Sequence, residues 1–262
     1  MIQEKIDALL GQQKEMYSMS RELYRDRDIY EREIDRIFLK SWLYAGHRSE
    51  IPGPGDWFLF EFGEESVIIV HGGDGNIRAL LNVCRHRGSR VCIEHKGCSR
   101  NLRCRYHGWT YDLDGQLMSA AHMDESFDKS EIGLKSIHVE VLDGMIFVNF
   151  ADEPASFEPV REGLSEVLAP YQLDSAKVAH RQSYPIRANW KLAVENYCEC
   201  YHCAPSHPEY SKGHSLARPD ARTADINAAV MERAAACGLS DKRINFIYQE
   251  SPGYGEDYSY DR

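Results

Sequence analysis

The sequence predicts an α+β protein, in which an antiparallel β domain is followed by a second domain that opens with helices. Seven short β-rich runs lie between residues 57 and 150, and glycine-bearing turns separate them. Two pairs of cysteine and histidine stand among these runs, and a helical stretch with two more histidines follows residue 189. Together these observations indicate a small sheet domain with a metal-binding tip, joined to a further metal-binding segment.

Composition limits the function classes. The chain has 262 residues, 43% hydrophobic and 11% aromatic, which is typical of a globular protein. Its net charge of −10 argues against nucleic acid as a partner. Neither a secretion signal nor an apolar run long enough to span a membrane is found, so we expect a cytoplasmic protein without a membrane partner. Eight cysteines in that setting favour reduced thiols and metal ligands.

The N-terminal 45 residues are expected to form a helical segment. Residues 1–20 are polar and weakly helical, and should lie on the surface or against a neighbouring subunit. Asp28 and Glu31 form a capping-box pattern ahead of an amphipathic helix over 29–42. The apolar residues at helical spacing are Tyr30, Ile34, Ile37, Phe38 and Trp42.

The β domain should occupy residues 46–150. The predicted strands cover 57–62, 66–71, 77–83, 109–113, 116–119, 136–142 and 145–150. Asp114-Gly115 and Asp143-Gly144 predict two hairpin turns. An acidic linker with two prolines then begins a second domain over 151–262, with helices expected at 160–168 and 224–237 and a strand at 177–187.

Two ligand pairs lie in the β domain, Cys84 with His86 and Cys104 with His107. Two thiolates and two imidazoles suit either a tetrahedral zinc ion or an iron–sulfur cluster in which histidines replace cysteines on one iron. The single residue between Cys84 and His86 is fewer than zinc ligand pairs usually have, which favours the cluster. A structural zinc site and unliganded core cysteines remain as alternatives.

The motifs Cys-x-His followed by Arg-Gly, and Cys-x-x-His-Gly-Trp-x-Tyr, resemble the Rieske domain of the alpha subunits of non-haem iron ring-hydroxylating oxygenases. The resemblance implies a [2Fe–2S] cluster. Cys84 and Cys104 would hold one iron, and His86 and His107 the other.

A second candidate site follows Asn189, a good N-cap residue. Glu195, Glu199 and His202 fall on one face of the expected helix, at spacings of four and three. His207 comes five residues after His202. Pro205 and Pro208 each disfavour helical geometry at the residue before them, which would let the chain bend His207 back toward His202.

The two histidines resemble the metal-binding element of the same family. The resemblance implies that His202 and His207 bind a mononuclear Fe(II). It also implies that Glu199 connects to a Rieske histidine of the neighbouring subunit, matched here by His107, and passes electrons between the two centres. Two alternatives remain: a helix with core histidines, and a zinc site formed by His202 with Cys198, Cys200 and Cys203. For these three cysteines, packing in the core is favoured over zinc binding.

The family's third iron ligand is a carboxylate far downstream of the second histidine, and no acidic residue of this chain matches it. The resemblance therefore covers the Rieske domain and the first part of an α+β, helix-grip-like catalytic domain. We expect either a fragment of a longer polypeptide or an incomplete iron site.

The resemblance implies the oxygenase component of a multi-protein enzyme, and a homotrimer. Electrons from NAD(P)H would arrive through a flavin and iron–sulfur reductase or a ferredoxin, and O2 would be activated to hydroxylate or N-demethylate a small organic substrate. The stretch Glu199-Cys200-Tyr201-His202 resembles the branch that oxidises quaternary amines such as glycine betaine, carnitine or choline. The alternatives are an aromatic-ring dihydroxylating dioxygenase and a Rieske electron-transfer module without oxygenase activity.

Overall fold

The computed structural model describes residues 2–15, 17–124, 126–198 and 202–207, and beyond these 228–229, 231–233, 235–236 and 238. The described residues form two compact units. One unit runs from 27 to 183, and the other combines the residues up to 26 with those from 184 onward.

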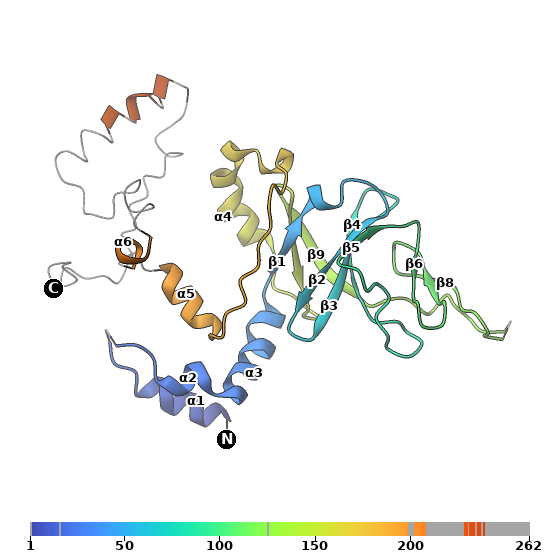
Figure 1. Ribbon diagram of the computed structural model, residues 1–262, viewed down its shortest axis with the longest axis horizontal. Helices are drawn as coiled ribbons and strands as arrows, with labels where there is room; N and C mark the ends of the chain where they lie inside the picture. The colour runs from blue at the N-terminus through green and yellow to red at the C-terminus, as the bar shows by residue number, and fades with distance from the viewer. Residues whose placement is uncertain are drawn as a thin grey trace. The chain divides into compact units, whose positions relative to one another are not determined.

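The larger unit is built on a sheet of seven strands in the order β1-β10-β9-β4-β3-β2-β5, all of whose neighbours are antiparallel (Figure 1). Its strands are β1 Leu43–His47, β2 Asp56–Phe62, β3 Glu65–His71, β4 Ile77–Leu81, β5 Lys96–Cys98, β9 Ser136–Leu142 and β10 Met145–Asn149. A second sheet contains β6 Leu102–Arg103, β7 Thr110–Tyr111 and β8 Leu117–Ser119. The predicted antiparallel β domain is confirmed.

Alternation along β3 explains how the large sheet forms two cores. Ile68 and Val70 point to the side that also contains Cys84 and Cys104, whereas Ile69 packs into a separate cluster on the opposite face. Successive side chains of a strand point to opposite faces, so a strand covered on both sides is apolar throughout. The candidate ligand cysteines are therefore part of a hydrophobic core.

The two predicted hairpin turns are confirmed. Asp143 and Gly144, between β9 and β10, both have positive φ angles, 48° and 79°, as a two-residue hairpin with the twist of its strands requires. A side chain at position 144 would collide with His47, because an added Cβ would lie 2.3 Å from His47 Nε2. Gly115 has a φ of 92° in the turn between β7 and β8.

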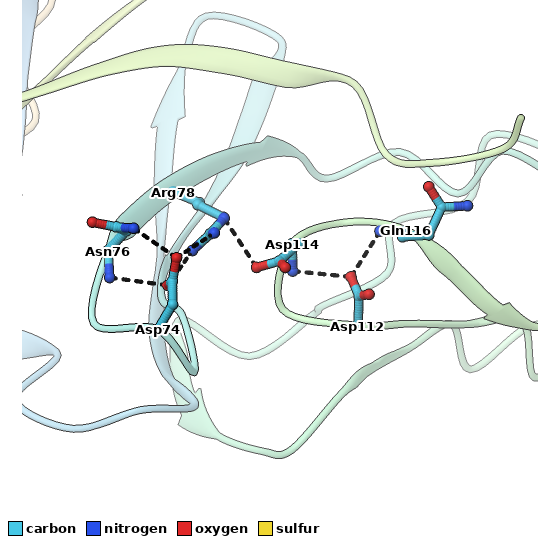
Figure 2. Close-up of polar contacts among 6 residues, drawn as sticks. All are labelled: Asp74, Asn76, Arg78, Asp112, Asp114 and Gln116. Carbon is cyan, nitrogen blue, oxygen red and sulfur yellow. Dashed lines mark hydrogen bonds and ion pairs between the residues drawn. The ribbon is translucent and has the colours of Figure 1, made fainter. Parts of the chain in front are cut away.

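Arg78 of β4 joins the two sheets (Figure 2). Its guanidinium donates to both oxygens of Asp74 in the β3–β4 turn, at 2.7 and 2.8 Å, and Nε lies 3.0 Å from Asp114 in the β7–β8 turn. That second turn is itself fixed, since Asp112 Oδ1 accepts hydrogen bonds from the backbone N–H groups of Asp114 and Gln116. Through Arg78, the β3–β4 turn of the large sheet thus contacts the β7–β8 turn of the small sheet.

The other named elements are helices. The α-helices are α1 Ile2–Gly11, α2 Arg21–Arg25, α3 Arg27–Arg36, α4 Glu158–Leu168, α5 Trp190–Cys198 and α6 Cys203–Ser206. Short 3-10 turns cover Phe38–Lys40, Arg48–Glu50, Ala169–Tyr171 and Leu173–Ser175. No helix among the described residues is long and apolar enough to cross a membrane.

Three expectations from the sequence need correction. The helix expected at 29–42 begins at Arg27 and ends at Arg36, so Asp28 lies inside its first turn and does not cap it. The strand expected at 177–187 is wrong, because these residues are exposed and form neither helix nor strand. The strands β1, β5 and β6 were not predicted. The helix expected at 224–237 lies mostly outside the described residues.

Candidate metal centres

The first ligand loop follows β4 and contains Cys84 and His86. The backbone N–H of Cys84 donates to the carbonyl oxygen of Ser89 at 2.8 Å, and the N–H of Gly88 donates to the carbonyl oxygen of Cys84 at 2.9 Å. Gly88 has a φ of 71°, which a residue with a side chain rarely adopts. These two hydrogen bonds close a tight turn around the ligands.

The second ligand loop, between β6 and β7, repeats this turn. Cys104 N–H donates to the carbonyl oxygen of Trp109 at 2.9 Å, and Gly108 N–H donates to that of Cys104 at 3.0 Å. Gly108 has a φ of 75°. The histidines occupy different places in the two turns, since His86 is two residues after its cysteine and His107 is three residues after its own.

The four predicted cluster ligands come together. The rings of His86 and His107 have centroids 4.5 Å apart and are inclined at 77°. Cys84 and Cys104 are both buried, and the Cys104 thiol is close enough to Cys84 to raise the pKa of Cys84. Side chains from two loops twenty positions apart in the sequence are therefore brought together by the fold.

Aromatic rings fix the orientation of the histidines. Trp109 stacks on His86 with a centroid distance of 4.9 Å and an interplanar angle of 11°. Tyr106 lies against His107 with a centroid distance of 3.8 Å. His86 Nδ1 is buried and has no hydrogen-bond partner. A buried ring nitrogen without a partner is unfavourable unless a ligand occupies it, so this atom fits a metal bond.

The electrostatics of the thiols and imidazoles also fit metal binding. Burial raises the pKa of Cys84, so the protein alone does not stabilise its thiolate, and a metal ion would supply the missing positive charge. Loss of hydration, with a smaller contribution from His86, lowers the pKa of His107 and keeps this ring in the neutral form that binds metals. The donor set of two thiols and two imidazoles, with an unpartnered Nδ1, thus fits a cluster of the Rieske type.

Tyr111 contacts the candidate ligand Cys84, which the sequence did not reveal. Its hydroxyl oxygen lies 3.3 Å from Cys84 Sγ and accepts a hydrogen bond from the backbone N–H of Arg85 at 3.0 Å. A metal-bound thiolate has no proton, so the hydroxyl would donate to the sulfur in the loaded site. The tyrosine belongs to the quoted motif, but its partner Cys84 is 27 residues away and only the fold shows the contact.

The second candidate site begins with α5. Asn189 Oδ1 accepts a hydrogen bond from the N–H of Lys191 at 3.0 Å, which confirms the predicted N-cap. Glu195 accepts a hydrogen bond from the hydroxyl of Tyr24 at 2.7 Å, and burial together with this carboxylate raises the pKa of Tyr24. The chain between 199 and 201, with the proposed electron-transfer residue Glu199 and the neighbouring Cys200, lies outside the described residues.

His202 and His207 flank α6 and approach each other. Their ring centroids are 5.6 Å apart at an angle of 82°. His207 has φ −134° and ψ 64°, so the chain leaves helical geometry at the residue before Pro208, as expected. The same expectation is wrong for Pro205, because α6 runs from Cys203 to Ser206 and includes both Pro205 and the residue before it. Of the cysteines expected to pack in a core, Cys203 is buried and Cys198 is exposed.

Within the described part of the chain, no three or more histidine, cysteine or acidic side chains gather around a single ion position. Two protein ligands for each iron of a two-iron cluster are compatible with this finding. The histidine pair would likewise supply two of the three ligands that a facial triad needs.

Comparison with known proteins connects both sites to one family. Residues 41–138 match the Rieske [2Fe-2S] domain, and residues 173–249 match the catalytic domain of ring-hydroxylating alpha subunits. The glycine betaine monooxygenase oxygenase subunit of Pseudomonas aeruginosa is 39% identical over 87% of this chain and 53% of its own length. The benzene 1,2-dioxygenase subunit alpha of Pseudomonas putida is 37% identical over 69% of this chain and 42% of its own.

Among solved structures, the quaternary ammonium Rieske monooxygenase CntA in complex with L-carnitine is similar, with a TM-score of 0.70 and 34% identity. The match covers 75% of this chain and 57% of that one. The chain spans about half the length of the curated relatives it matches. The first matched region contains the four candidate cluster ligands, and the second contains His202 and His207. The chain therefore belongs to the alpha-subunit family of Rieske non-haem iron ring-hydroxylating oxygenases.

Proposed function

We propose that this chain is the oxygenase component, or part of it, of a Rieske non-haem iron oxygenase. One observation carries the proposal: two turns with the same hydrogen bonds meet, so that both cysteines are buried and the two histidine rings lie 4.5 Å apart. When bound, a [2Fe–2S] cluster transfers single electrons, and a mononuclear Fe(II) activates O2.

The residues of the chain take distinct roles in this proposal. Cys84 and Cys104 hold one iron as thiolates, and His86 and His107 hold the other as neutral imidazoles. The surrounding core excludes water from the sulfurs, and Tyr111 donates a hydrogen bond to one of them. His202 and His207 provide two ligands of the mononuclear iron. Glu199 connects that iron to the cluster of a neighbouring subunit in a homotrimer.

We propose a small quaternary amine as the substrate, hydroxylated or N-demethylated with O2. The 39% identity to a glycine betaine monooxygenase subunit and the similarity to a carnitine-bound structure support this choice. The benzene dioxygenase relative favours the alternative, dihydroxylation of an aromatic ring. Electrons would come from NAD(P)H through a flavin and iron–sulfur reductase or a ferredoxin.

We also propose that the Rieske domain covers residues 46–150 and follows an N-terminal helical segment over 1–45. Residues 151–262 would then form the first part of the catalytic domain. The matches over 41–138 and 173–249 support this division.

The test measures iron and acid-labile sulfide per chain in the purified protein and in a His202→Ala, His207→Ala variant. We expect the variant to lose one iron and to keep all its sulfide, because only the mononuclear site uses these rings. Two irons per chain in both proteins, which the cluster alone accounts for, would instead support an electron-transfer module. For the substrate, reductase-coupled O2 consumption should rise with glycine betaine or carnitine and not with benzene.

A further inference from the structure

The two ligand loops share one turn but are closed at their bases in different ways. The second loop is closed by strand pairing, since Leu102 pairs with Tyr111 and Arg103 with Thr110. The first loop leaves β4 and returns through Val91 and Cys92, which belong to no strand. Something other than a β ladder must therefore hold its two ends together.

The side chain of Asn82 does so. Its Oδ1 accepts hydrogen bonds from the backbone N–H groups of Val91 and Cys92, both at 2.9 Å, and its Nδ2 donates to the carbonyl oxygen of Cys92 at 2.8 Å. Nδ2 also donates to Ser66 Oγ of β3 at 3.1 Å. The side chain is fully buried, and these four bonds use the whole capacity of an amide.

The position of Asn82 connects this closure to the cluster. Asn82 precedes Cys84 by two residues, and its own backbone N–H donates to the carbonyl oxygen of Ser66 at 2.8 Å. The loop between Asn82 and Val91 contains Cys84 and His86 and none of the second pair. A change in the amide would therefore reach one cysteine and one histidine and spare the other two ligands.

We propose that Asn82 is a positioning residue for the cluster, whose side chain sets the geometry of Cys84 and His86 in place of a strand pair. This inference rests on the proposed function, because it assumes that the four ligands hold a [2Fe–2S] cluster. Residues that orient metal ligands without touching the metal alter metal affinity by about tenfold to a hundredfold when they are replaced.

The test compares Asn82→Leu and Asn82→Asp with the same changes at Asn149. Asn149 is a matched control because it is equally buried, and its amide bonds the backbone of Lys40 and Ala151, away from the ligand loops. Two quantities are measured on the reduced holoprotein: the rate of iron release to a chelator, and the two histidine nitrogen couplings by pulsed EPR.

We expect Asn82→Leu to release iron about ten times faster or more, and to change one nitrogen coupling while the other stays as in the wild type. Asn82→Asp keeps the acceptor oxygen and should release iron at a rate between those of the wild type and Asn82→Leu. Both Asn149 variants should release iron at the wild-type rate, even where they unfold at lower temperature. If Asn82→Leu yields no folded protein, Ser66→Ala, which removes only the hydroxyl that accepts from Nδ2, should shift the same coupling in the same direction.

The inference would be overturned if the nitrogen couplings are unchanged in every folded variant at positions 82 and 66. It would also be overturned if the Asn149 variants accelerate iron release as much as the Asn82 variants do. A wild-type protein that binds no cluster would instead refute the proposed function and can be recognised before any variant is made.

Discussion

The two candidate metal centres use similar ligands in opposite settings. The cluster ligands come from two loops twenty residues apart, and a seven-stranded and a three-stranded sheet bring them together. His202 and His207 are five residues apart and flank a single short helix, α6. The first site depends on the whole fold of its unit, and the second pair depends on local backbone geometry.

The difference shows how the ligands of each site would become ordered. In the larger unit the protein has already buried the sulfurs, stacked Trp109 on His86 and fixed both turns, so the ordering of the ligands is part of folding. At α6 two rings meet, but a facial triad still needs a carboxylate. In the proposed iron site, metal binding would therefore contribute to ordering the ligands, as it does wherever a site is incomplete before the metal binds.

The largest expected effect is the loss of the cluster from a ligand variant. In Cys104→Ser, labile sulfide and visible absorption should disappear, because a hydroxyl does not replace a thiolate at iron. The control is Cys92→Ser. Cys92 is also buried but belongs to neither cysteine–histidine pair, so this variant should keep its labile sulfide and visible absorption. The contrast between the two centres holds if the mononuclear iron remains in Cys104→Ser; its loss would mean that the two sites depend on each other.

A smaller effect is expected when the contact of Arg78 between the two sheets is removed. Arg78→Ala removes the hydrogen bonds to Asp74 and the contact with Asp114, and should lower the free energy of unfolding by about 1–2 kcal/mol after allowance for partial exposure. Urea denaturation monitored by cluster absorption measures it. Arg27→Ala, which breaks an exposed ion pair with Glu31 on α3, should leave the midpoint unchanged. Equal effects of the two variants would contradict a special role for Arg78.

Tyr111→Phe should lower the reduction potential of the cluster. A hydrogen bond to a sulfur stabilises the more negative, reduced form, and a bond of about 1 kcal/mol corresponds to about 40 mV for one electron. A redox titration followed by EPR gives the shift. A potential that stays constant or rises would show that the hydroxyl does not donate to Cys84. Histidine-bound iron at α6 should be retained, since Tyr111 belongs to the cluster site alone.

Tyr24→Phe tests the helix that precedes the histidine pair. The variant loses the hydrogen bond to Glu195, which joins α2 and α5, and should destabilise the smaller unit by about 0.5 kcal/mol. Hydrogen exchange of the α5 amides should become faster, while the EPR spectrum of the cluster stays the same. A changed cluster spectrum would refute the separation of the two centres into independently built sites.

Local patterns predicted the parts of the fold that depend on neighbouring residues. The strand at 136–142 coincides with β9, and the Asp143-Gly144 turn has the predicted form, because alternation and glycine at positive φ are properties of short stretches. The ligand loops were predicted for the same reason. The N-cap at Asn189 was also predicted, and the helix expected at 160–168 is α4, which begins two residues earlier.

Long-range pairing explains what was missed. β6 has two residues and becomes a strand only because Leu102 and Arg103 meet β7, and β5 depends on β2 in the same way. Residues 177–187 have strand-like composition, but no described strand pairs with them. The sequence did not reveal the roles of Asn82 and Tyr111 for a related reason, since their partners lie nine or more residues away and the contacts exist only after folding.

The place of β1 in the sheet has a consequence for biosynthesis. Its hydrogen-bonding partner is β10, with Leu43 opposite Val148, so roughly a hundred residues must be made before the first strand has a neighbour. Both cysteine and histidine pairs leave the ribosome earlier than that. The core around Cys84 and Cys104 contains no residue of β1 or β10 and its last member in the chain is Leu134, so this core can close before β1 gains its partner.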